Sequence, residues 1–353
     1  MTKERDFSLF ERWPDSVFYA PVFFYWLWLS LKHRSLTLPT ITNLPPALSG
    51  YLGESKSEAL DLLGKVGRAH VAPYACFATS PDAASDLAHA REAITAAGLS
   101  YPLVAKPDVG QNGAGVRIIR GEEGLVRYLT EFPRGVRLIL QAYVVPEGEA
   151  GVFYVRYPNK PHGRIVSLTL KYFPRLTGDG IKTLRQLIEA DPRAARIKNL
   201  YFKRHVARLE EVVPAGASIK LLSVGNHCKG AIFKDGAAQI TPSMEDAFDA
   251  IAQEIPGFYF GRFDVRFSEL EDLKLGKNFT IIEVNGADSE MTHIWDACTT
   301  LSHAWRDQFY QFRMAFEIGA INRAAGAKPS GPRAFLSAWR RNRRLFSAYS
   351  WEE

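Results

Sequence analysis

The sequence predicts an α+β fold in which helices cover antiparallel sheets. Short apolar runs with strand character alternate with helical segments, and many of the returns between the runs are as short as hairpins. The chain has 353 residues, of which 46% are hydrophobic and 23% are charged. This length exceeds what one core usually organises, so two or three subdomains are expected.

Start and stop signals allow the elements to be assigned in chain order. Ser55 or Ser57 is a suitable cap for a short helix, and the helical segment 80–97 opens with Ser-Pro and stops at Gly98. Further predicted helices cover 122–132, 183–190, 244–254, 302–323 and 334–346. Predicted strands cover 101–106, 116–119, 137–144, 151–157, 163–170, 230–233, 260–267 and 279–285.

The most hydrophobic stretch, residues 16–31, carries no formal charge and is rich in aromatic residues. It is shorter than the ~20 apolar residues of a bilayer span, it contains Pro21, and Lys32 follows it. Mixed charges before it and the lack of a small-residue cleavage site argue against a signal peptide. We expect a buried helix or a subunit interface that forms a homodimer. The alternative is an aromatic segment that lies on a membrane surface beside Lys32 and Arg34.

Charge and cysteine content narrow the class of protein. The net charge is +6, from 44 basic and 38 acidic residues, which favours anionic ligands. Basic and aromatic residues are not interleaved as in nucleic-acid-binding modules, so no nucleic-acid partner is expected. Cys76, Cys228 and Cys298 form no CxxC pair, which argues against a disulfide scaffold and a thiolate zinc site. We therefore expect a cytoplasmic protein, with peripheral membrane association as the open alternative.

A glycine-rich loop between two predicted strands is the first segment with chemical character. Lys106 ends the first strand, and Gly110, Gly113 and Gly115 lie in the loop. Glycines let the backbone approach a phosphate closely, and a lysine supplies a positive charge. The spacing matches neither the P-loop nor the dinucleotide fingerprint, and such a loop taken alone is more often a plain turn.

Two later predicted strands carry acidic residues. Asp264 lies in FDVRF, and Glu283 and Asn285 share one face of IIEVN because strand side chains alternate. If the strands are neighbours, three oxygen ligands converge, which suits Mg²⁺ held together with substrate phosphates, and Arg262 and Arg266 offset phosphate charge. The alternative is a structural acid paired with these arginines across a hairpin. A carboxylate flanked by isoleucine and valine is costly without a partner, which favours the metal interpretation.

The order of these parts resembles the ATP-grasp superfamily of carboxylate-amine and carboxylate-thiol ligases. VAKPDVGQNGAGV is similar to the family's lysine strand and phosphate-covering loop, and LILQAYVVPEGEAGVFY is similar to its interdomain hinge. FDVRF and IIEVN are similar to its two metal strands. The resemblance implies Mg²⁺ ligands at Asp264, Glu283 and Asn285, with Mn²⁺ as an alternative ion. It implies that ATP is bound by Lys106, Gly110, Gly113, Gly115, Val116, Gln141, Ala142, Tyr143, Val144 and Glu149.

A further segment, GDGIKTLRQLI, is similar to one in the cyanophycin-synthetase and glutamate-ligase branch of this family. In that branch a basic residue before the loop reaches the phosphates, and Lys171 is the matching residue here. Where relatives often carry N-x-S-x-G-G, this chain has NHCKGA at 226–231. As a whole the chain most resembles proteins described as carboxylate-amine ligases or as D-alanine–D-alanine ligase-like.

The resemblance implies an ATP-grasp fold, in which two α+β subdomains clamp a nucleotide. It would occupy 80–300, between an N-terminal hydrophobic and mixed region at 1–79 and a C-terminal helix and basic tail at 301–353. That tail, around 340–344, is expected to be an accessory helix or a loosely ordered end.

The implied activity is that of an ADP-forming ligase with small-molecule carboxylate and amine substrates. Lys106, Lys171, Arg262 and Arg266 would stabilise charge while a carboxylate becomes an acyl phosphate, which an amine then attacks. The loop that carries Asp288, Ser289, Glu290 and His293 is the candidate for contacts to the acceptor substrate, and the open alternative is an ordinary polar loop. The open alternatives are a thiol acceptor, a phosphotransferase, and a nucleotide-switched protein that binds a membrane surface.

Overall fold

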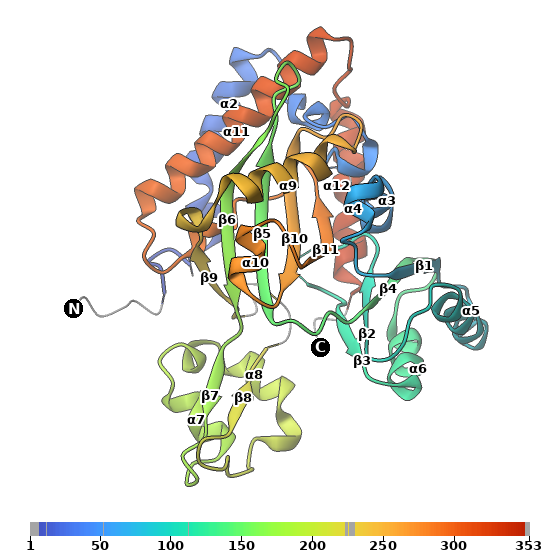
Figure 1. Cartoon of the computed structure of the whole chain (residues 1–353), viewed down its shortest axis with the longest axis vertical. Helices are drawn as coiled ribbons and strands as arrows, with labels where there is room; N and C mark the ends of the chain where they lie inside the picture. The colour runs from blue at the N-terminus through green and yellow to red at the C-terminus, as the bar shows by residue number, and fades with distance from the viewer. Residues whose placement is uncertain are drawn as a thin grey trace.

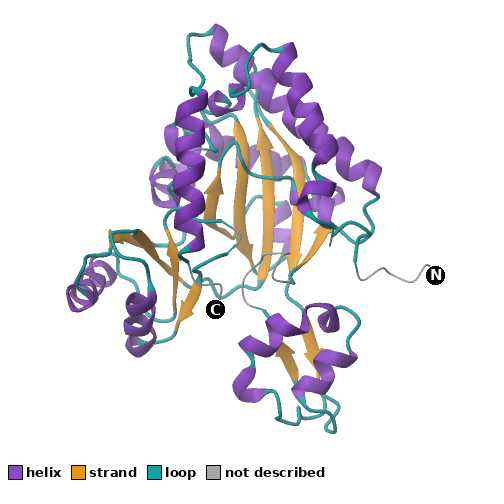
Figure 2. Ribbon diagram, turned by 180° about the vertical axis from the view of Figure 1, so that it is seen from behind, coloured by secondary structure: helices purple, strands orange, loops and turns teal. Residues whose placement is uncertain are grey.

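The computed structural model describes residues 7–349, apart from residues 12, 52, 112, 223–224 and 226–229. The described chain forms a five-stranded sheet, a four-stranded sheet and a two-stranded sheet, with helices packed around them (Figures 1 and 2). The α+β class predicted from the sequence is confirmed. Residues 226–229 of the NHCKGA segment, including Cys228, lie outside the described residues.

The five-stranded sheet is antiparallel throughout, with the order β11–β10–β5–β6–β9. Its strands are β5 (Gly148–Val155), β6 (Arg164–Tyr172), β9 (Ile232–Asp235), β10 (Phe260–Phe267) and β11 (Phe279–Asn285). The ranges of β10 and β11 are those that the sequence predicts. Successive side chains point to opposite faces, so Val152 and Tyr154 enter one core while Phe153 and Val155 enter another.

Helices cover both faces of this sheet (Figure 1). One face is covered by α9 (Pro242–Gln253), α10 (Leu270–Lys274) and α3 (Lys56–Asp61), with α4 (Lys65–Arg68) beside them. The opposite face is covered by the long helix α11 (Leu301–Ala324), which contributes Met314 and Ile318 to the core. Thr241 and Thr300 accept hydrogen bonds from backbone amides at the starts of α9 and α11, which fixes where these helices begin.

The four-stranded sheet has the order β1–β4–β2–β3 and is also antiparallel. Its strands are β1 (Tyr74–Ala78), β2 (Leu103–Pro107), β3 (Arg117–Ile119) and β4 (Arg137–Ala142). Helices α5 (Ala83–Ala96) and α6 (Glu122–Glu131) pack on it around Leu103, Leu125 and Leu138. Gly98 follows α5 with φ +61°, as expected of a helix stop. The sequence does not predict β1, which is short and only half-buried.

A small unit projects from the end of β6 (Figure 1). It pairs β7 (Arg175–Thr177) with β8 (Ser218–Lys220) and packs α7 (Leu184–Ala190) and α8 (Lys198–Arg204) around its own core of Leu184, Ile188 and Tyr201. Thr183 and Gln186 form a capping box at the start of α7, which is the helix that the sequence predicts here. The other elements of this unit are not predicted, because each is very short.

The N-terminal hydrophobic segment forms α1 (Asp15–Phe18) and α2 (Ala20–Lys32). One side of α2 packs along α11, where Trp26 contacts Phe312 and Phe316. This contact bears out part of the predicted burial. Within the described residues, no helix has both the length and the apolar character needed to cross a membrane.

The C-terminal segment forms α12 (Pro332–Ser347), so the accessory-helix alternative describes it. Short 3₁₀ helices cover Leu38–Ile41, Pro46–Leu48, Ala194–Ile197, Val206–Arg208, Ala237–Gln239 and Thr292–Trp295. Cys76 and Cys298 are free thiols. The proposed division into regions at 79/80 and 300/301 stays a prediction.

Candidate functional site

A cavity of about 700 Å³ lies between the five-stranded and the four-stranded sheets. The five-stranded sheet contributes β5, β6, β10 and β11 to its lining, and the four-stranded sheet contributes β2, β4 and the glycine loop after β2. Of the residues that the sequence proposes for ATP, Mg²⁺ and charge stabilisation, all except Gly115 line this cavity. The lining residues from that set are Lys106, Gly110, Gly113, Val116, Gln141, Ala142, Tyr143, Val144, Glu149, Lys171, Arg262, Arg266, Asp264, Glu283 and Asn285.

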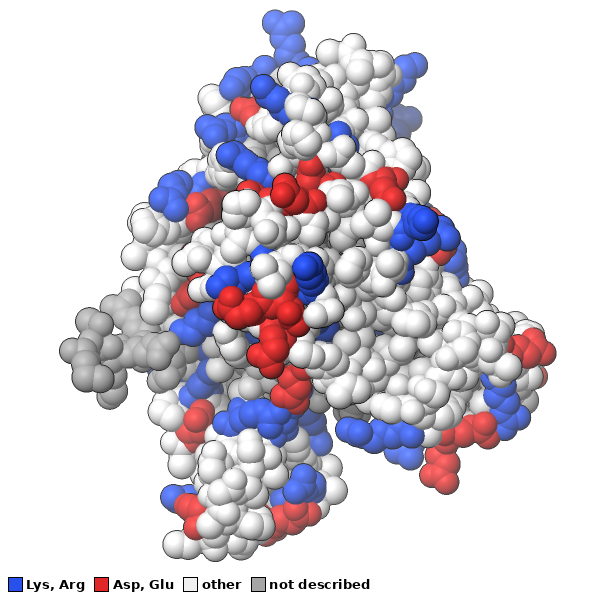
Figure 3. Space-filling model, in the orientation of Figure 1, with Lys and Arg blue, Asp and Glu red and all other residues white. Residues whose placement is uncertain are grey.

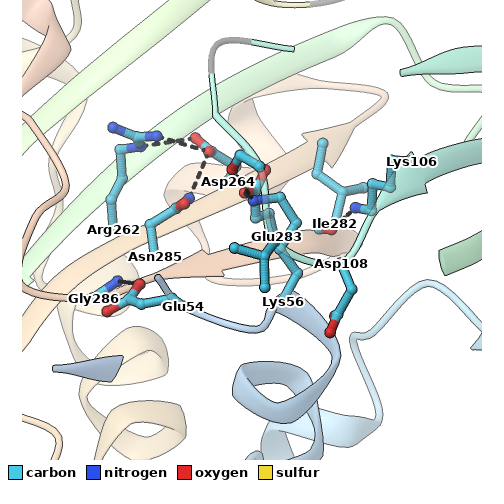
Figure 4. A network of polar contacts seen from close by, with 12 residues as sticks. Glu54, Lys56, Lys106, Asp108, Arg262, Asp264, Ile282, Glu283, Asn285 and Gly286 are labelled. Carbon is cyan, nitrogen blue, oxygen red and sulfur yellow. Dashed lines mark hydrogen bonds and ion pairs between the residues drawn. The ribbon is translucent and has the colours of Figure 1, made fainter. Parts of the chain in front are cut away.

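Asp264 is the most strongly bound carboxylate of the cavity wall. It is buried, and Lys171 Nζ donates to its Oδ1 at 2.9 Å. Arg262 donates to both carboxylate oxygens at 3.1 Å, and Asn285 Nδ2 donates to Oδ2 at 3.1 Å (Figure 4). Burial alone would raise the pKa of Asp264, but Arg262 and Lys171 outweigh it and hold the pKa far below its ordinary value. Asp264 is therefore a carboxylate at every pH of interest.

Glu149 shares the cations of this wall with Asp264. Its Oε1 accepts from Lys171 Nζ at 3.1 Å, and its Oε2 pairs with Arg266 at 2.9 Å. Burial would lower the pKa of Lys171, but the two flanking carboxylates, Asp264 and Glu149, raise it above its ordinary value. Both oxygens of Glu149 are thus engaged by cations. Its part in binding ATP, which the resemblance implies, stays a prediction.

Glu283 lies directly opposite Asp264, because the two residues are register partners on β11 and β10. The register shifts just after this pair, so that Val265 faces Ile281 and Ile282 has no partner on β10. Such a bulge re-aims the backbone, and here the Ile282 carbonyl accepts a hydrogen bond from Lys106 Nζ at 3.0 Å. The irregularity therefore serves the contact between the two sheets.

Lys106 projects from β2 toward this pair of carboxylates (Figure 4). Its ammonium is buried and donates to Gln141 Oε1 at 2.8 Å, in addition to Ile282. Burial lowers the pKa of Lys106 to about 8, with Lys56 adding to the effect and Glu283 opposing it. A buried cation held mainly by neutral oxygens is available to an incoming anion.

Lys56, which is not among the site residues predicted from the sequence, pairs with Glu283 at 3.0 Å. Lys56 Nζ also donates to the Gly110 carbonyl at 2.7 Å, so it joins the glycine loop to the acidic strand. Its position depends on Asp108, which accepts from Ser55 Oγ at 2.7 Å and from the Ser57 amide at 2.8 Å at the start of α3. Lys56 lies far from Lys106 and Glu283 in sequence, and only the segment GESKSE, a polar loop ahead of a helix, marks it.

The glycine loop has the backbone geometry that its sequence implies. Gly113 has φ +69° and Gly115 has φ +70°, a region that other residues rarely adopt. A side chain at Gly115 would also meet the ring of Pro107 at 2.8 Å. The loop therefore lies close against the end of β2, with Lys106 next to it.

Helix α12 forms another wall of the cavity that the sequence analysis did not anticipate. Its lining side chains follow helical spacing on one face, and they are Phe335, Trp339, Asn342, Arg343 and Phe346. Beyond the helix, Tyr349 is buried in the core of the four-stranded sheet, and its hydroxyl donates to the Val109 carbonyl at 2.6 Å. The basic C-terminal segment is thus attached to the glycine loop.

The loop proposed for the acceptor substrate divides into two parts. Asp288, Ser289 and Glu290 line the cavity. His293 does not, because its ring bonds to Ser167 Oγ at 2.7 Å and to Asp307 at 3.0 Å, between β6 and α11. His293 therefore joins elements of the fold.

The donor set at Asp264, Glu283 and Asn285 suits a hard divalent cation. Two carboxylates and an amide oxygen are the oxygen ligands that Mg²⁺ takes when substrate phosphates complete its coordination. Among the described residues there is no group of three His, Cys, Asp or Glu side chains placed to hold a metal by themselves. The residues thus fit Mg²⁺ that arrives with a phosphate ligand, and their role as metal ligands stays a prediction.

No protein-family model and no curated protein matches the chain. Solved structures similar to it include a bifunctional glutathione synthetase from Pasteurella multocida, with 14% identity over 78% of this chain and a TM-score of 0.38. Others are the D-cycloserine synthetase DcsG, with 14% identity over 74% and a TM-score of 0.39, and the VanG D-Ala:D-Ser ligase from Enterococcus faecalis, with 13% identity over 76% and a TM-score of 0.41.

The alignments cover different shares of these three proteins. They span 38% of the glutathione synthetase, 71% of the D-cycloserine synthetase and 63% of the D-Ala:D-Ser ligase. The activity and substrates of this chain are therefore proposals, which depend on the geometry of its own site.

Proposed function

We propose that the chain is an ATP- and Mg²⁺-dependent ligase of the ATP-grasp type, which activates a carboxylate as an acyl phosphate for attack by an amine. One observation carries the proposal. The facing carboxylates Asp264 and Glu283 are surrounded by Lys56, Lys106, Lys171 and Arg262, inside a cavity of about 700 Å³ between two antiparallel sheets. Acids and bases gathered in this way suit a polyanion that arrives with a divalent cation.

The nucleotide would bind between the two sheets. The backbone of 141–144, which leads out of β4, would meet the adenine, and the glycine loop would cover the phosphates. Lys106 would donate to a phosphate oxygen, because its present partners are neutral oxygens and its charge is incompletely satisfied. The Gly113 conformation supports this role, since it keeps the loop backbone free of a side chain at the point of approach.

The phosphoryl step needs charge stabilisation more than a nucleophilic side chain. A substrate carboxylate oxygen would attack the γ-phosphorus, the bond to the bridging oxygen would break, and ADP would leave. Lys106, Lys171 and Arg262 would hold the phosphate oxygens in line for this transfer. Mg²⁺, when bound at Asp264, Glu283 and Asn285, neutralises phosphate charge in the same place.

The second step would form the amide. A neutral amine would attack the acyl carbon, phosphate would leave with the bonding electrons, and the amine would lose a proton to solvent or to a nearby carboxylate. Asp288 and Glu290 line the cavity, and burial raises the pKa of each carboxyl group. For Glu290, hydrogen bonds from Tyr19 and Trp295 lower the pKa but do not outweigh burial. Carboxylates with raised pKa values are suited to accept that proton, which supports this loop as the amine side of the cavity.

Product analysis tests the proposal directly. The protein would be incubated with ATP, Mg²⁺ and pools of small carboxylates and amines, and ADP, AMP, phosphate and coupled products would be separated and identified. We expect ADP and phosphate in equal amounts, dependent on both pools, and their loss in Asp264→Asn. The matched control is Asp246→Asn, at an exposed position on α9.

Other products would replace the proposal with its alternatives. A thioester formed only with a thiol pool would indicate a thiol acceptor. A stable phosphorylated product without amide would indicate a phosphotransferase, and AMP with pyrophosphate would exclude an acyl-phosphate mechanism.

A further inference from the structure

Helix α2 is apolar on all sides, although it lies at the outside of the molecule. Over Ala20–Lys32 its only charged residue is Lys32 at the end. A helix that is hydrophobic all round is normally enclosed by protein or lipid. Within the part of the chain that the structure describes, however, only one side of α2 is enclosed, by α11 and its neighbours, through Val22, Trp26 and Leu29.

The opposite side of α2 presents large apolar side chains to solvent. Phe23 is 58% exposed, Phe24 68%, Trp28 52% and Leu31 79%. Spacings of four and three residues place Phe24, Trp28 and Leu31 along one face of the helix. Phe23 lies beside this row, with its ring centre 5.9 Å from that of Phe24. These four residues, which we call the aromatic face, form a continuous ridge on the helix rather than scattered single exposures.

Basic side chains border the aromatic face at its C-terminal end. Lys32 lies over the Trp28 ring, with its ammonium 5.2 Å from the ring centre, and the exposed Arg34 follows two residues later. Arg323 of α11 donates to the His33 carbonyl at 2.9 Å, so it belongs to the same end. Figure 3 shows basic side chains gathered toward this upper end of the molecule, where Figure 1 places α2 and the end of α11.

Among the described residues, the carboxylate that acts on His33 at this end is that of Glu317, and it is already engaged. Glu317 on α11 accepts a hydrogen bond from Tyr157 and lies 3.8 Å from Arg313. His33 adds no charge near neutral pH, because burial lowers its pKa and Lys32 and Arg323 lower it further. The border of the aromatic face is therefore positively charged.

We propose that α2 is a membrane-docking helix, which lies flat on an anionic lipid surface with its aromatic face among the acyl chains and Lys32, Arg34 and Arg323 at the headgroups. Aromatic rings next to lysine and arginine suit the boundary between acyl chains and headgroups. Each basic residue at the surface adds attraction to anionic lipid. This inference does not depend on the proposed ligase reaction, because none of these residues lines the cavity.

The size of the aromatic face favours lipid over a second copy of the chain. Aromatic side chains offer ~150–250 Å² each, so the observed exposures amount to roughly 400–500 Å² of apolar surface. A stable protein–protein interface needs about 800 Å² from each partner. The aromatic face is too small for that alone, whereas a lipid surface needs only a buried apolar strip and charge attraction.

Vesicle sedimentation of the full chain tests the proposal. Vesicles of phosphatidylcholine alone would be compared with vesicles that also contain phosphatidylglycerol, in low and in high salt. We expect binding to the anionic vesicles, weakened by salt, and reduced at least about tenfold by Phe24→Ser with Trp28→Ser. Lys32→Glu with Arg34→Glu should reduce binding to a similar extent on anionic vesicles only.

The matched control removes exposed apolar side chains elsewhere. Ile181 is 81% exposed and Val206 72% exposed in the unit between β7 and β8, so Ile181→Ser with Val206→Ser should leave vesicle binding unchanged. Circular dichroism and thermal unfolding of each variant check that it is folded.

Three results would overturn the proposal. In the first, the wild type does not sediment with anionic vesicles. In the second, folded Phe24→Ser/Trp28→Ser sediments as much as the wild type. In the third, Ile181→Ser/Val206→Ser loses as much vesicle binding as Phe24→Ser/Trp28→Ser does. A wild type that is dimeric by light scattering and becomes monomeric in Phe24→Ser/Trp28→Ser, without vesicle binding, would assign the aromatic face to self-association instead.

Discussion

The two walls of the cavity hold their charges in different ways. On the five-stranded sheet, Asp264 is matched by Lys171 and Arg262, so that buried charges compensate one another within a rigid ladder. On the four-stranded sheet, Lys106 is buried against neutral oxygens, and the glycine loop beside it is held by Lys56 and Tyr349. The buried charge of Asp264 is thus balanced by opposite charges without a ligand, whereas the ammonium group of Lys106 is held by neutral oxygens.

This difference indicates that the two walls have different roles in binding and reaction. Buried ion pairs are costly to break but fix geometry, which suits residues that must hold a metal and a reacting carboxylate in place. An incompletely satisfied lysine and a tethered loop are suited to receive an anion and close over it. Substitutions of Asp264 and of Lys106 should therefore have different consequences for stability and similar consequences for ATP binding.

The largest effect is expected from Asp264→Asn. The substitution leaves Lys171 and Arg262 without their shared carboxylate in a buried setting, which should lower the free energy of unfolding by about 3–5 kcal/mol. ATP turnover should fall by a factor on the order of 100–1,000. Urea unfolding and an ADP-release assay measure the two effects. If Asp264→Asn were as stable and as active as Asp246→Asn, Lys171 and Arg262 would not depend on the charge of Asp264, which would contradict this description of the five-stranded wall.

Lys106→Met should weaken ATP binding without lowering the stability of the fold. The variant removes a desolvated cation, so its stability at pH 7 should equal or exceed that of the wild type. Its affinity for ATP should fall roughly 10–100-fold, as for loss of a hydrogen bond to a charged group. Titration calorimetry with MgATP and urea unfolding check both statements. Strong destabilisation with unchanged affinity would show that Lys106 is a structural cation.

The pH dependence of Lys106→Met sharpens this test. The pKa of Lys106 is about 8 in the folded chain against 10.5 for an ordinary lysine. Between these pH values the unfolded chain binds the additional proton, so the wild type should gain stability as the pH rises from 8 to 10.5. Lys106→Met should lack this gain. Parallel stability–pH curves for the two proteins would contradict the lowered pKa.

A smaller effect is expected from Lys56→Met. It removes the link between Glu283 and the Gly110 carbonyl, at a cost of about 1–3 kcal/mol in the free energy of unfolding. We expect KM for ATP to rise several-fold more than kcat falls, because the loop loses an anchor while the other cations remain. Steady-state kinetics separates the two constants, and Lys65→Met, at an exposed position, is the control. A pure kcat effect would instead place Lys56 in the chemical step.

The smallest effect is expected from Tyr349→Phe. The hydroxyl donates one hydrogen bond to the Val109 carbonyl, which is worth about 1 kcal/mol. We expect dissociation of ATP to become a few times faster, measured by stopped-flow fluorescence, and the free energy of unfolding to fall by no more than the value of this one hydrogen bond. Tyr172→Phe, at a half-exposed position, should leave the rate unchanged. Equal rates in all three proteins would mean that α12 does not hold the glycine loop.

Part of each wall can be predicted from the sequence. Asp264, Glu283 and Asn285 lie on strands whose alternating pattern is local, so both the strands and their ranges follow from short stretches of sequence. The glycine loop and Lys106 are equally local. The chain therefore reveals the general position of the site before the structure does.

The remaining parts of the site arise from contacts between distant segments. Lys56 reaches Glu283 because Asp108 holds the start of α3, and no spacing rule connects these three residues. The segment of α12 reads as a basic helix, and nothing local in it shows that Phe335, Trp339 and Phe346 line the cavity. The burial of Tyr349 in the core of the four-stranded sheet holds the end of this helix there. Strands as short as β7 and β8 carry too few residues for a periodic pattern.

Titration calorimetry of MgATP tests most directly the claim that the cavity between the two sheets binds a nucleotide with its metal. Wild type would be titrated with ATP in Mg²⁺ and in EDTA, alongside Glu283→Gln and the exposed control Glu271→Gln. The proposal predicts one binding site that requires Mg²⁺, is retained in Glu271→Gln and is lost or at least tenfold weaker in folded Glu283→Gln. Absence of binding, or binding of equal strength without Mg²⁺ and in Glu283→Gln, would contradict it.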